Sequence, residues 1–137
     1  MSRNKALEKV GRARVAYTLQ QKGWKVGEAF ADGYDLLAYH PSKKKACYIE
    51  LKTMDIDNRS EGVNLTAPVS AHERKTCTHI IAYIEPKGRF FIARKDKILT
   101  SKGSIFAALK KDGSFSKPRK DSKSFTPYED KWDELLK

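Results

Sequence analysis

Residues 46–52 place the tightest constraint on what this chain can fold into. Two kinds of side chain alternate there, with Cys47, Ile49 and Leu51 in one set and Tyr48, Glu50 and Lys52 in the other. Successive side chains of a strand point to opposite faces of its sheet. The segment is therefore predicted as a strand with one face on a core, and with Glu50 and Lys52 together on the other face.

Further segments have the composition of strands and predict a sheet around this one: residues 24–30, 34–39, 79–84 and 89–93. The polar loop at residues 40–45 predicts a hairpin between the second and third strands in chain order. The turn Pro86-Lys87-Gly88 predicts a second hairpin between the last two.

Helical patterns precede and interrupt these strands. Residues 4–21 predict a helix that ends at Lys22-Gly23, and Ser70-Ala71-His72-Glu73 is a capping box that opens a short helix ending near Thr76. Two more helices are predicted near the C-terminus, at residues 104–111 and 127–136, on either side of an exposed segment at 112–126. The order α-β-β-β-α-β-β with a helical C-terminal tail predicts an α/β (α+β) fold with helices flanking a mixed central sheet.

The first predicted helix carries two stripes on nearly opposite sides: Ala6, Val10, Ala13 and Tyr17 form one, and Glu8, Arg12, Val15 and Leu19 form the other. Because apolar residues occur on both sides, we expect this helix to be sandwiched between layers. Residues 55–68 are polar and irregular and predict a loop.

Length and charge limit the class of protein. The 137 residues fit one domain, with a core over about residues 4–99 and a basic C-terminal extension over about residues 100–137. The formal net charge is +11, and Lys87–Lys123 holds 12 basic and 3 acidic side chains, a balance of +9. Such density favours a polyanionic partner such as nucleic acid; the alternative is a solvated basic surface.

The location follows from other features. No apolar run approaches the ~20 residues that span a bilayer, and the N-terminal residues lack the apolar region of a secretory signal. Cys47 and Cys77 lie 30 positions apart, without the spacing of a metal site. We expect reduced thiols in a cytoplasmic protein that does not associate with membranes.

Three side chains carry the chemistry. Asp35 begins the strand before the alternating one, and a register centred on the hairpin loop brings it toward Glu50 and Lys52. Two carboxylates suit a hard divalent cation such as Mg²⁺, which uses few protein ligands and can activate water at a phosphate. The alternative is a surface ion pair between Glu50 and Lys52, with a contribution of ~0–1 kcal/mol to stability.

This combination resembles the PD-(D/E)xK nuclease superfamily. The matching segments are Gly33-Tyr34-Asp35-Leu36-Leu37-Ala38 and Tyr48-Ile49-Glu50-Leu51-Lys52-Thr53, behind a helix that ends in Gly23-Trp24. The resemblance implies a restriction-endonuclease-like core in which Asp35, Glu50 and the Leu51 carbonyl hold Mg²⁺, with Mn²⁺ as a substitute. It implies that Lys52 is the catalytic lysine.

The chain departs from the superfamily in its first helix. Many members carry a glutamate there that reaches the metal, whereas Arg12 or Arg14 stands at the expected place. Glu8, one turn before Arg12, is the candidate to complete the metal site, and its alternative role is a helix ion pair with Arg12.

The resemblance implies an endonuclease that hydrolyses DNA phosphodiester bonds. The small size favours a structure-selective homodimer acting on duplex or branched DNA, similar to junction-resolving members. The alternative is a non-catalytic nucleic-acid-binding module that retains the fold. Candidate contacts with nucleic acid are Arg12, His72, Arg74, Lys75, Arg119 and Lys120.

Overall fold

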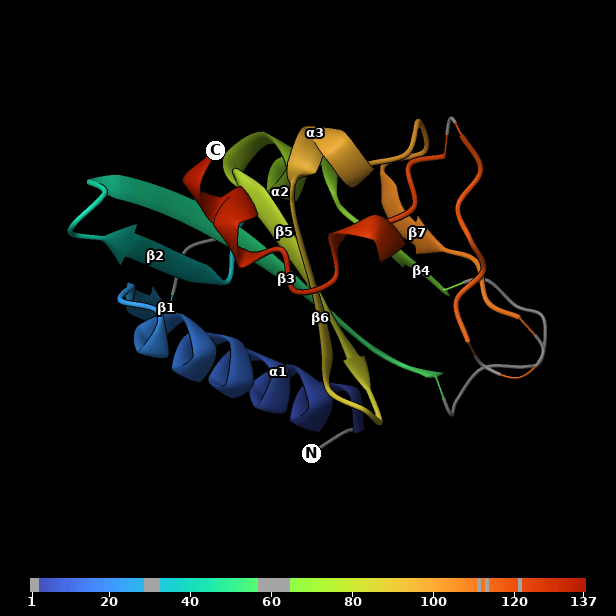
Figure 1. The fold of residues 1–137 in the computed structure, drawn as a ribbon, viewed down its shortest axis with the longest axis horizontal. Coiled ribbons are helices and arrows are strands. Elements are labelled where there is room, and N and C mark those ends of the chain that lie inside the picture. Colours follow the sequence, from blue (N-terminus) through green and yellow to red (C-terminus); the bar gives the residue numbers. More distant parts are fainter. Residues whose placement is uncertain (1–2, 29–32, 57–64, 111, 113, 121) are drawn as a thin grey trace.

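The computed structural model describes residues 3–28, 33–56, 65–110, 112, 114–120 and 122–137. In chain order the elements are α1 (Arg3–Gln21), β1 (Lys25–Glu28), β2 (Leu36–His40), β3 (Lys45–Asp55), β4 (Leu65–Pro68), α2 (Ala71–Thr76), β5 (His79–Glu85), β6 (Arg89–Arg94), α3 (Lys95–Ile98), β7 (Ser104–Ala107) and the 3₁₀ helices η2 (Thr126–Tyr128) and η3 (Trp132–Leu136). The helix-flanked α/β fold predicted from the sequence is confirmed (Figure 1).

The five predicted strands form one sheet in the order β1-β2-β3-β5-β6. The β3–β5 pair is parallel and the other three pairs are antiparallel, so the sheet is mixed as predicted. Both predicted hairpins, β2–β3 and β5–β6, are present. α2 lies between the parallel strands β3 and β5 in sequence, as the connection of parallel neighbours requires a crossover.

β3 is longer than its neighbour β2, and this difference creates an open edge. The β2–β3 pairing ends where Leu36 faces Ile49. Residues 50–55 of β3 continue beside β5, and no described strand pairs with them on the β2 side. Glu50, Leu51 and Lys52 therefore lie where β3 emerges from the sheet.

The sheet separates two apolar clusters. α1 covers one face (Figure 1), where Val15 and Leu19 pack with sheet residues and with Trp132 and Leu135 of η3. On the other face, β4 and β7 form a two-stranded ribbon. Its buried side chains join those of β5 and β6, with Leu65, Ile80, Phe91, Ile105 and Phe125 in one cluster.

The structure corrects the predictions for two segments, residues 55–68 and 104–111. The sequence predicts a helix at residues 104–111, but Ser104–Ala107 form β7, and β7 pairs with β4 inside the predicted loop at 55–68. Burial alternates along both strands, with Leu65 and Ala67 buried opposite Ala107 and Ile105. The apolar period is therefore two residues, and each strand is too short to stand out without its partner.

Further corrections concern helices. The stripe that includes Val10 and Tyr17 is solvent-exposed, at 42% and 63%, so the predicted sandwich is wrong: α1 packs on a single sheet face. The closing helix predicted at 127–136 is instead two 3₁₀ segments, η2 and η3.

No helix in the described part of the chain is long and apolar enough to cross a membrane. Cys47 and Cys77 are both buried and unpaired.

Candidate active site

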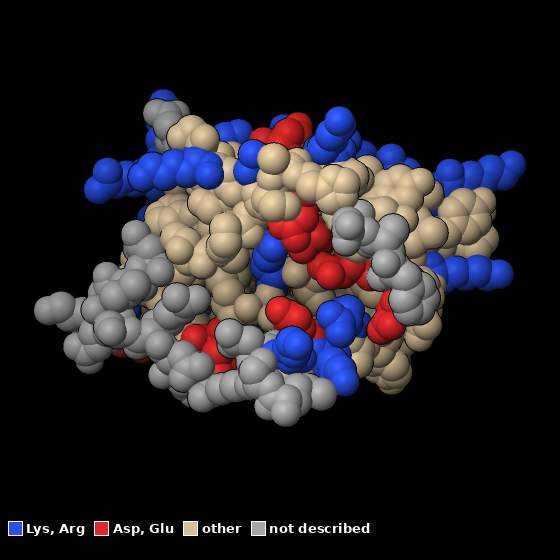
Figure 2. All heavy atoms as spheres, turned by 180° about the vertical axis from the view of Figure 1, so that it is seen from behind, with Lys and Arg blue, Asp and Glu red and all other residues tan. Residues whose placement is uncertain are grey.

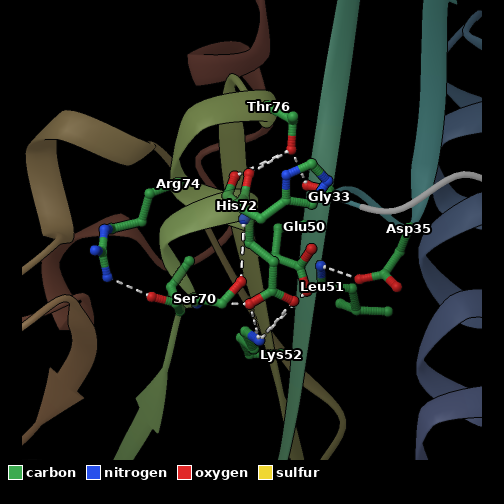
Figure 3. Close-up of polar contacts among 11 residues, drawn as sticks. Gly33, Asp35, Glu50, Leu51, Lys52, Ser70, His72, Arg74 and Thr76 are labelled. Atoms are coloured by element: carbon green, nitrogen blue, oxygen red, sulfur yellow. Dashed lines mark hydrogen bonds and ion pairs between the residues drawn. The ribbon is translucent and has the colours of Figure 1, made fainter.

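Asp35 lies immediately before β2 and extends its pairing with β3 by one step. Its backbone N–H donates to the Ile49 carbonyl at 2.8 Å, and its carboxylate Oδ2 accepts the Leu51 N–H at 2.8 Å (Figure 3). This contact holds the carboxylate at the open edge of β3.

Gly33 allows the tight turn that precedes Asp35 and β2. Its φ is +105°, and a Cβ there would lie 1.9 Å from Thr76 Oγ1. The Thr76 hydroxyl donates to the Gly33 carbonyl at 2.7 Å, which ties the turn before Asp35 to the end of α2. Glycine fits because it adopts positive φ and leaves room for this approach.

Glu50 and Lys52 project from the same face of β3, as their spacing predicts. Lys52 Nζ lies 3.3 Å from Glu50 Oε1, and the side chains are 18% and 5% exposed for Lys52 and Glu50 respectively. Lys52 Nζ also donates to Glu73 Oε1 and Oε2 of α2, at 3.3 and 3.4 Å. The pair is thus partly buried and has a third member, unlike a simple surface ion pair.

The electrostatics of this cluster disfavour an ionised Glu50. Burial, followed by the negative charge of Asp35 and a hydrogen bond with Glu73, raises the pKa of Glu50 to about 9, although Lys52 opposes the rise. Burial also acts to raise the pKa of Glu73, but the hydrogen bond from the Ser70 N–H and its contacts with Glu50 and Lys52 outweigh it, so the pKa of Glu73 is lowered. A cation placed beside Asp35 and Glu50 would relieve this repulsion.

These groups line a cavity of about 240 Å³, with walls formed by Glu8, Arg12, Asp35, Glu50, Leu51, Lys52, Thr53, Ala67 and Glu73. In Figure 2 acidic side chains lie in and around a hollow of the face shown, with basic side chains among them. Gly11 brings α1 to this cavity, since a Cβ there would lie 2.5 Å from Thr53 Cγ2. Glu8 and Arg12 flank that close approach.

The donor set suits Mg²⁺. Among the described residues no group of three or more His, Cys, Asp or Glu side chains is arranged to hold a metal. Mg²⁺ commonly uses only one or two carboxylates and retains several waters, which Asp35 and Glu50 can satisfy. The Leu51 N–H points to Asp35, and the carbonyl of a strand residue points to the same edge as its N–H. The Leu51 carbonyl is therefore available as a third oxygen ligand.

The structure places only some of the predicted nucleic-acid contacts at the cavity. Arg12 lines the cavity, and its Nε lies 4.0 Å from Glu28 Oε1. Arg74 donates to the Val69 carbonyl at 2.6 Å and points away from Lys52 (Figure 3), so it supports the start of α2. His72 and Lys75 lie on α2, and both are exposed.

The last two candidate contacts lie outside the cavity. Arg119 lines a separate groove of about 430 Å³ beside β7, with Phe106 and Lys117. Lys120 is exposed next to it in the chain.

Sequence reasoning missed Glu73 as a member of this site. The sequence identifies the residue only as the last position of the capping box, and the structure confirms that box: Ser70 Oγ accepts the Glu73 N–H and Glu73 Oε1 accepts the Ser70 N–H, at 3.1 and 2.7 Å. Nothing in the local pattern indicates that the same carboxylate reaches Lys52. That contact depends on how α2 packs against β3.

The mixed five-stranded sheet with its flanking helices matches nuclease-like folds, as predicted. The structure is similar to a bacterial homing endonuclease, I-Ssp6803I, with a TM-score of 0.69 and 18% identity over 99% of this chain and 93% of that one. It is also similar to Hjc, a Holliday junction resolvase from Archaeoglobus fulgidus, with a TM-score of 0.51 and 14% identity over 78% and 84% of the two chains. No protein-family model and no curated protein matches the sequence significantly.

Proposed function

We propose that this protein is a metal-dependent endonuclease that hydrolyses phosphodiester bonds in DNA. The observation that carries the proposal is the meeting of Asp35, Glu50 and Lys52 in one cavity, with Glu50 buried beside a second negative charge. A buried carboxyl group in this position is costly for a metal-free protein, and a cation offsets the cost. Groups arranged at such a cost are typical of functional sites.

The residues of the cavity would divide the work. Asp35, Glu50 and the Leu51 carbonyl would hold Mg²⁺ or Mn²⁺, which supplies a water of lowered pKa and neutralises charge on the phosphate. The Lys52 ammonium presents three donors and would stabilise the negative charge that develops on the phosphate oxygens in the transition state. Arg12 would bind a phosphate of the strand being cut, and Glu8, which also lines the cavity, would supply a further oxygen at the metal.

The chemistry of the surface supports DNA as the substrate class. The chain carries a net charge of +11, and the two similar structures are named as a homing endonuclease and a Holliday junction resolvase. We propose structure-selective cleavage of duplex or branched DNA by a homodimer, since each site acts on one strand. The exposed side chains of Val10 and Tyr17 on α1 are available for a second copy, and light scattering of the purified protein tests this state.

A cleavage assay tests the proposal directly. Linear duplex, single-stranded, flap and four-way-junction DNA are incubated with the protein in Mg²⁺, Mn²⁺ or EDTA. We expect cleavage only with a metal, and we expect Lys52→Ala to abolish it while DNA affinity is retained, because the lysine acts in the transition state. Full turnover by Lys52→Ala would limit the lysine to an ion-pair role.

A second candidate function is a non-catalytic nucleic-acid-binding module with this fold. The specific observation in its favour is that Arg12 lines the cavity from α1, where many superfamily members carry a glutamate that reaches the metal. Tight binding to all four DNA substrates, with no cleavage under any metal, would support it over the nuclease.

A further inference from the structure

Glu73 has a place in the site that the motif does not include. Its carboxylate comes from α2, not from β3, yet both of its oxygens lie within hydrogen-bond distance of Lys52 Nζ, at 3.3 and 3.4 Å. Glu50 Oε1 lies at the same 3.3 Å from that nitrogen. The Lys52 ammonium is therefore held between the side-chain carboxyl groups of two different elements, β3 and α2.

The capping box fixes the position of this carboxylate. Glu73 Oε1 accepts the Ser70 N–H at 2.7 Å while the Ser70 hydroxyl accepts the Glu73 N–H at 3.1 Å. The first of these bonds restrains the Glu73 carboxylate directly, and the second holds its backbone. A second tie, from the Thr76 hydroxyl to the Gly33 carbonyl, joins the far end of α2 to the turn before Asp35.

We propose that Glu73 is the positioning residue for Lys52, so that the N-terminal turn of α2 holds the catalytic ammonium in place. This inference rests on the proposed function. Lysine has a flexible four-carbon side chain whose ammonium makes no directional fork of its own, so its place must be set by its partners. Glu50 is also a residue that would bind the metal. A carboxylate that binds a cation interacts less strongly with the Lys52 ammonium. Glu73 then remains as the partner of Lys52.

Three variants separate this role from simple stabilisation of α2. Glu73→Gln keeps the capping box, since Gln is accepted at this position, but it removes the negative charge beside Lys52. Ser70→Ala removes the hydroxyl half of the box and leaves the Glu73 carboxylate in place. Glu129→Gln is the matched control for charge, because Glu129 forms a half-buried pair with Arg89 at 2.7 Å away from the cavity.

The kinetic readout is the split between kcat and KM on the DNA that wild-type protein cuts best. We expect Glu73→Gln to lower kcat by about 10- to 100-fold with KM nearly unchanged, because a displaced catalytic group costs rate more than binding. Ser70→Ala should lower the melting temperature by about 3–5 °C, the effect of removing a cap, with little change in kcat. Glu129→Gln should leave kcat as it is.

A second readout does not depend on activity. Nuclear magnetic resonance of lysine side-chain ammonium groups detects those that exchange slowly because they are held in hydrogen bonds. We expect a Lys52 signal, assigned by its loss in Lys52→Arg, in wild-type, Ser70→Ala and Glu129→Gln proteins, and its loss or broadening in Glu73→Gln. Should Gln at this position prevent folding, Glu73→Asp, whose side chain is one methylene shorter, tests the same contact.

The two proposals fail in different ways. Absence of cleavage by the wild-type protein would refute the nuclease, while the resonance experiment would still decide whether Glu73 holds Lys52. Cleavage by the wild type together with unaltered kcat or an unaltered Lys52 signal in Glu73→Gln would overturn the positioning role alone. An equal fall in kcat for Ser70→Ala and Glu73→Gln would assign the effect to the cap and also overturn it.

Discussion

Replacing Glu50 by glutamine should make the metal-free protein more stable while it destroys the metal site. Glutamine has the shape of a protonated glutamate. Its carbonyl can accept from Lys52 and its amide can donate to Glu73, so the contacts of the protonated Glu50 are kept. The substitution removes the free-energy cost of folding with Glu50, which must either be protonated or be buried as a charge.

The magnitude follows from the pKa of Glu50. It is about 9 in the folded protein because of burial and the neighbouring Asp35, against an ordinary value of 4.5. A raised carboxyl pKa leaves stability intact below the unfolded value of 4.5 and removes it progressively as the pH rises toward 9. At about pH 7 the interval above 4.5 is about 2.5 pH units, each equivalent to about 1.4 kcal/mol. Glu50→Gln should therefore raise the free energy of unfolding by about 3.5 kcal/mol at this pH.

Urea unfolding in EDTA, repeated from pH 4.5 to pH 8, measures this difference. The wild-type and Glu50→Gln curves should nearly coincide at the acid end and separate as the pH rises. Glu129→Gln is the control with the opposite sign, because the hydrogen bond from Arg89 lowers the pKa of Glu129. A Glu50→Gln protein that is no more stable than wild type at pH 7, or a difference that does not vary with pH, would refute the electrostatic account of the site.

Three further outcomes follow from the structure. Asp35→Asn keeps an oxygen that can accept the Leu51 N–H but removes the negative charge. In thermal unfolding, Mg²⁺ at 100 times the wild-type dissociation constant should stabilise the wild-type protein by about 2.7 kcal/mol and this variant much less. Equal stabilisation of the two proteins would exclude Asp35 as a metal ligand. Burial lowers the pKa of His79 below its ordinary value of about 6.5. The protein should therefore lose folding stability as the pH falls below about 6.5. Unfolding measured at pH 5 and pH 7.5 should show that His79→Asn removes this pH dependence. Arg119→Ser combined with Lys120→Ser should flatten the log–log salt dependence of DNA binding by roughly 0.9 for each phosphate that the protein no longer neutralises; an unchanged slope in fluorescence anisotropy would exclude these side chains from the interface.

The central sheet was predictable because its signals are local. Alternation along residues 46–52 sets which face of β3 carries Glu50 and Lys52, and a one-residue slip would move both to the opposite face. The short hairpin loop then sets the register of β2 against β3, which brings Asp35 to the same edge. The meeting of Asp35, Glu50 and Lys52 in one place could therefore be predicted from the sequence.

The ribbon and the orientation of α1 were not predictable in this way. β4 and β7 are four residues each and lie far apart in the chain, so neither shows a strand pattern until the other pairs with it. α1 has apolar residues on both sides, and only the sheet that it covers decides which side is buried. Gly11 marks the contact side, because a Cβ there would meet Thr53, but an isolated glycine does not reveal this in a sequence.

The features of the site also fall into two groups, those that local sequence sets and those that tertiary packing sets. The sequence by itself determined the pair of carboxylates and the lysine, because two strands joined by a short loop bring their side chains together whatever the rest of the fold does. Only the tertiary structure decided that Glu73 of α2 joins Lys52, that Glu8 and Arg12 face the same cavity, and that burial keeps Glu50 from ionising readily. These properties arise where α1, α2 and β4 close around the open edge of β3, and both the contacts and the desolvation depend on distances between segments that are remote in the chain.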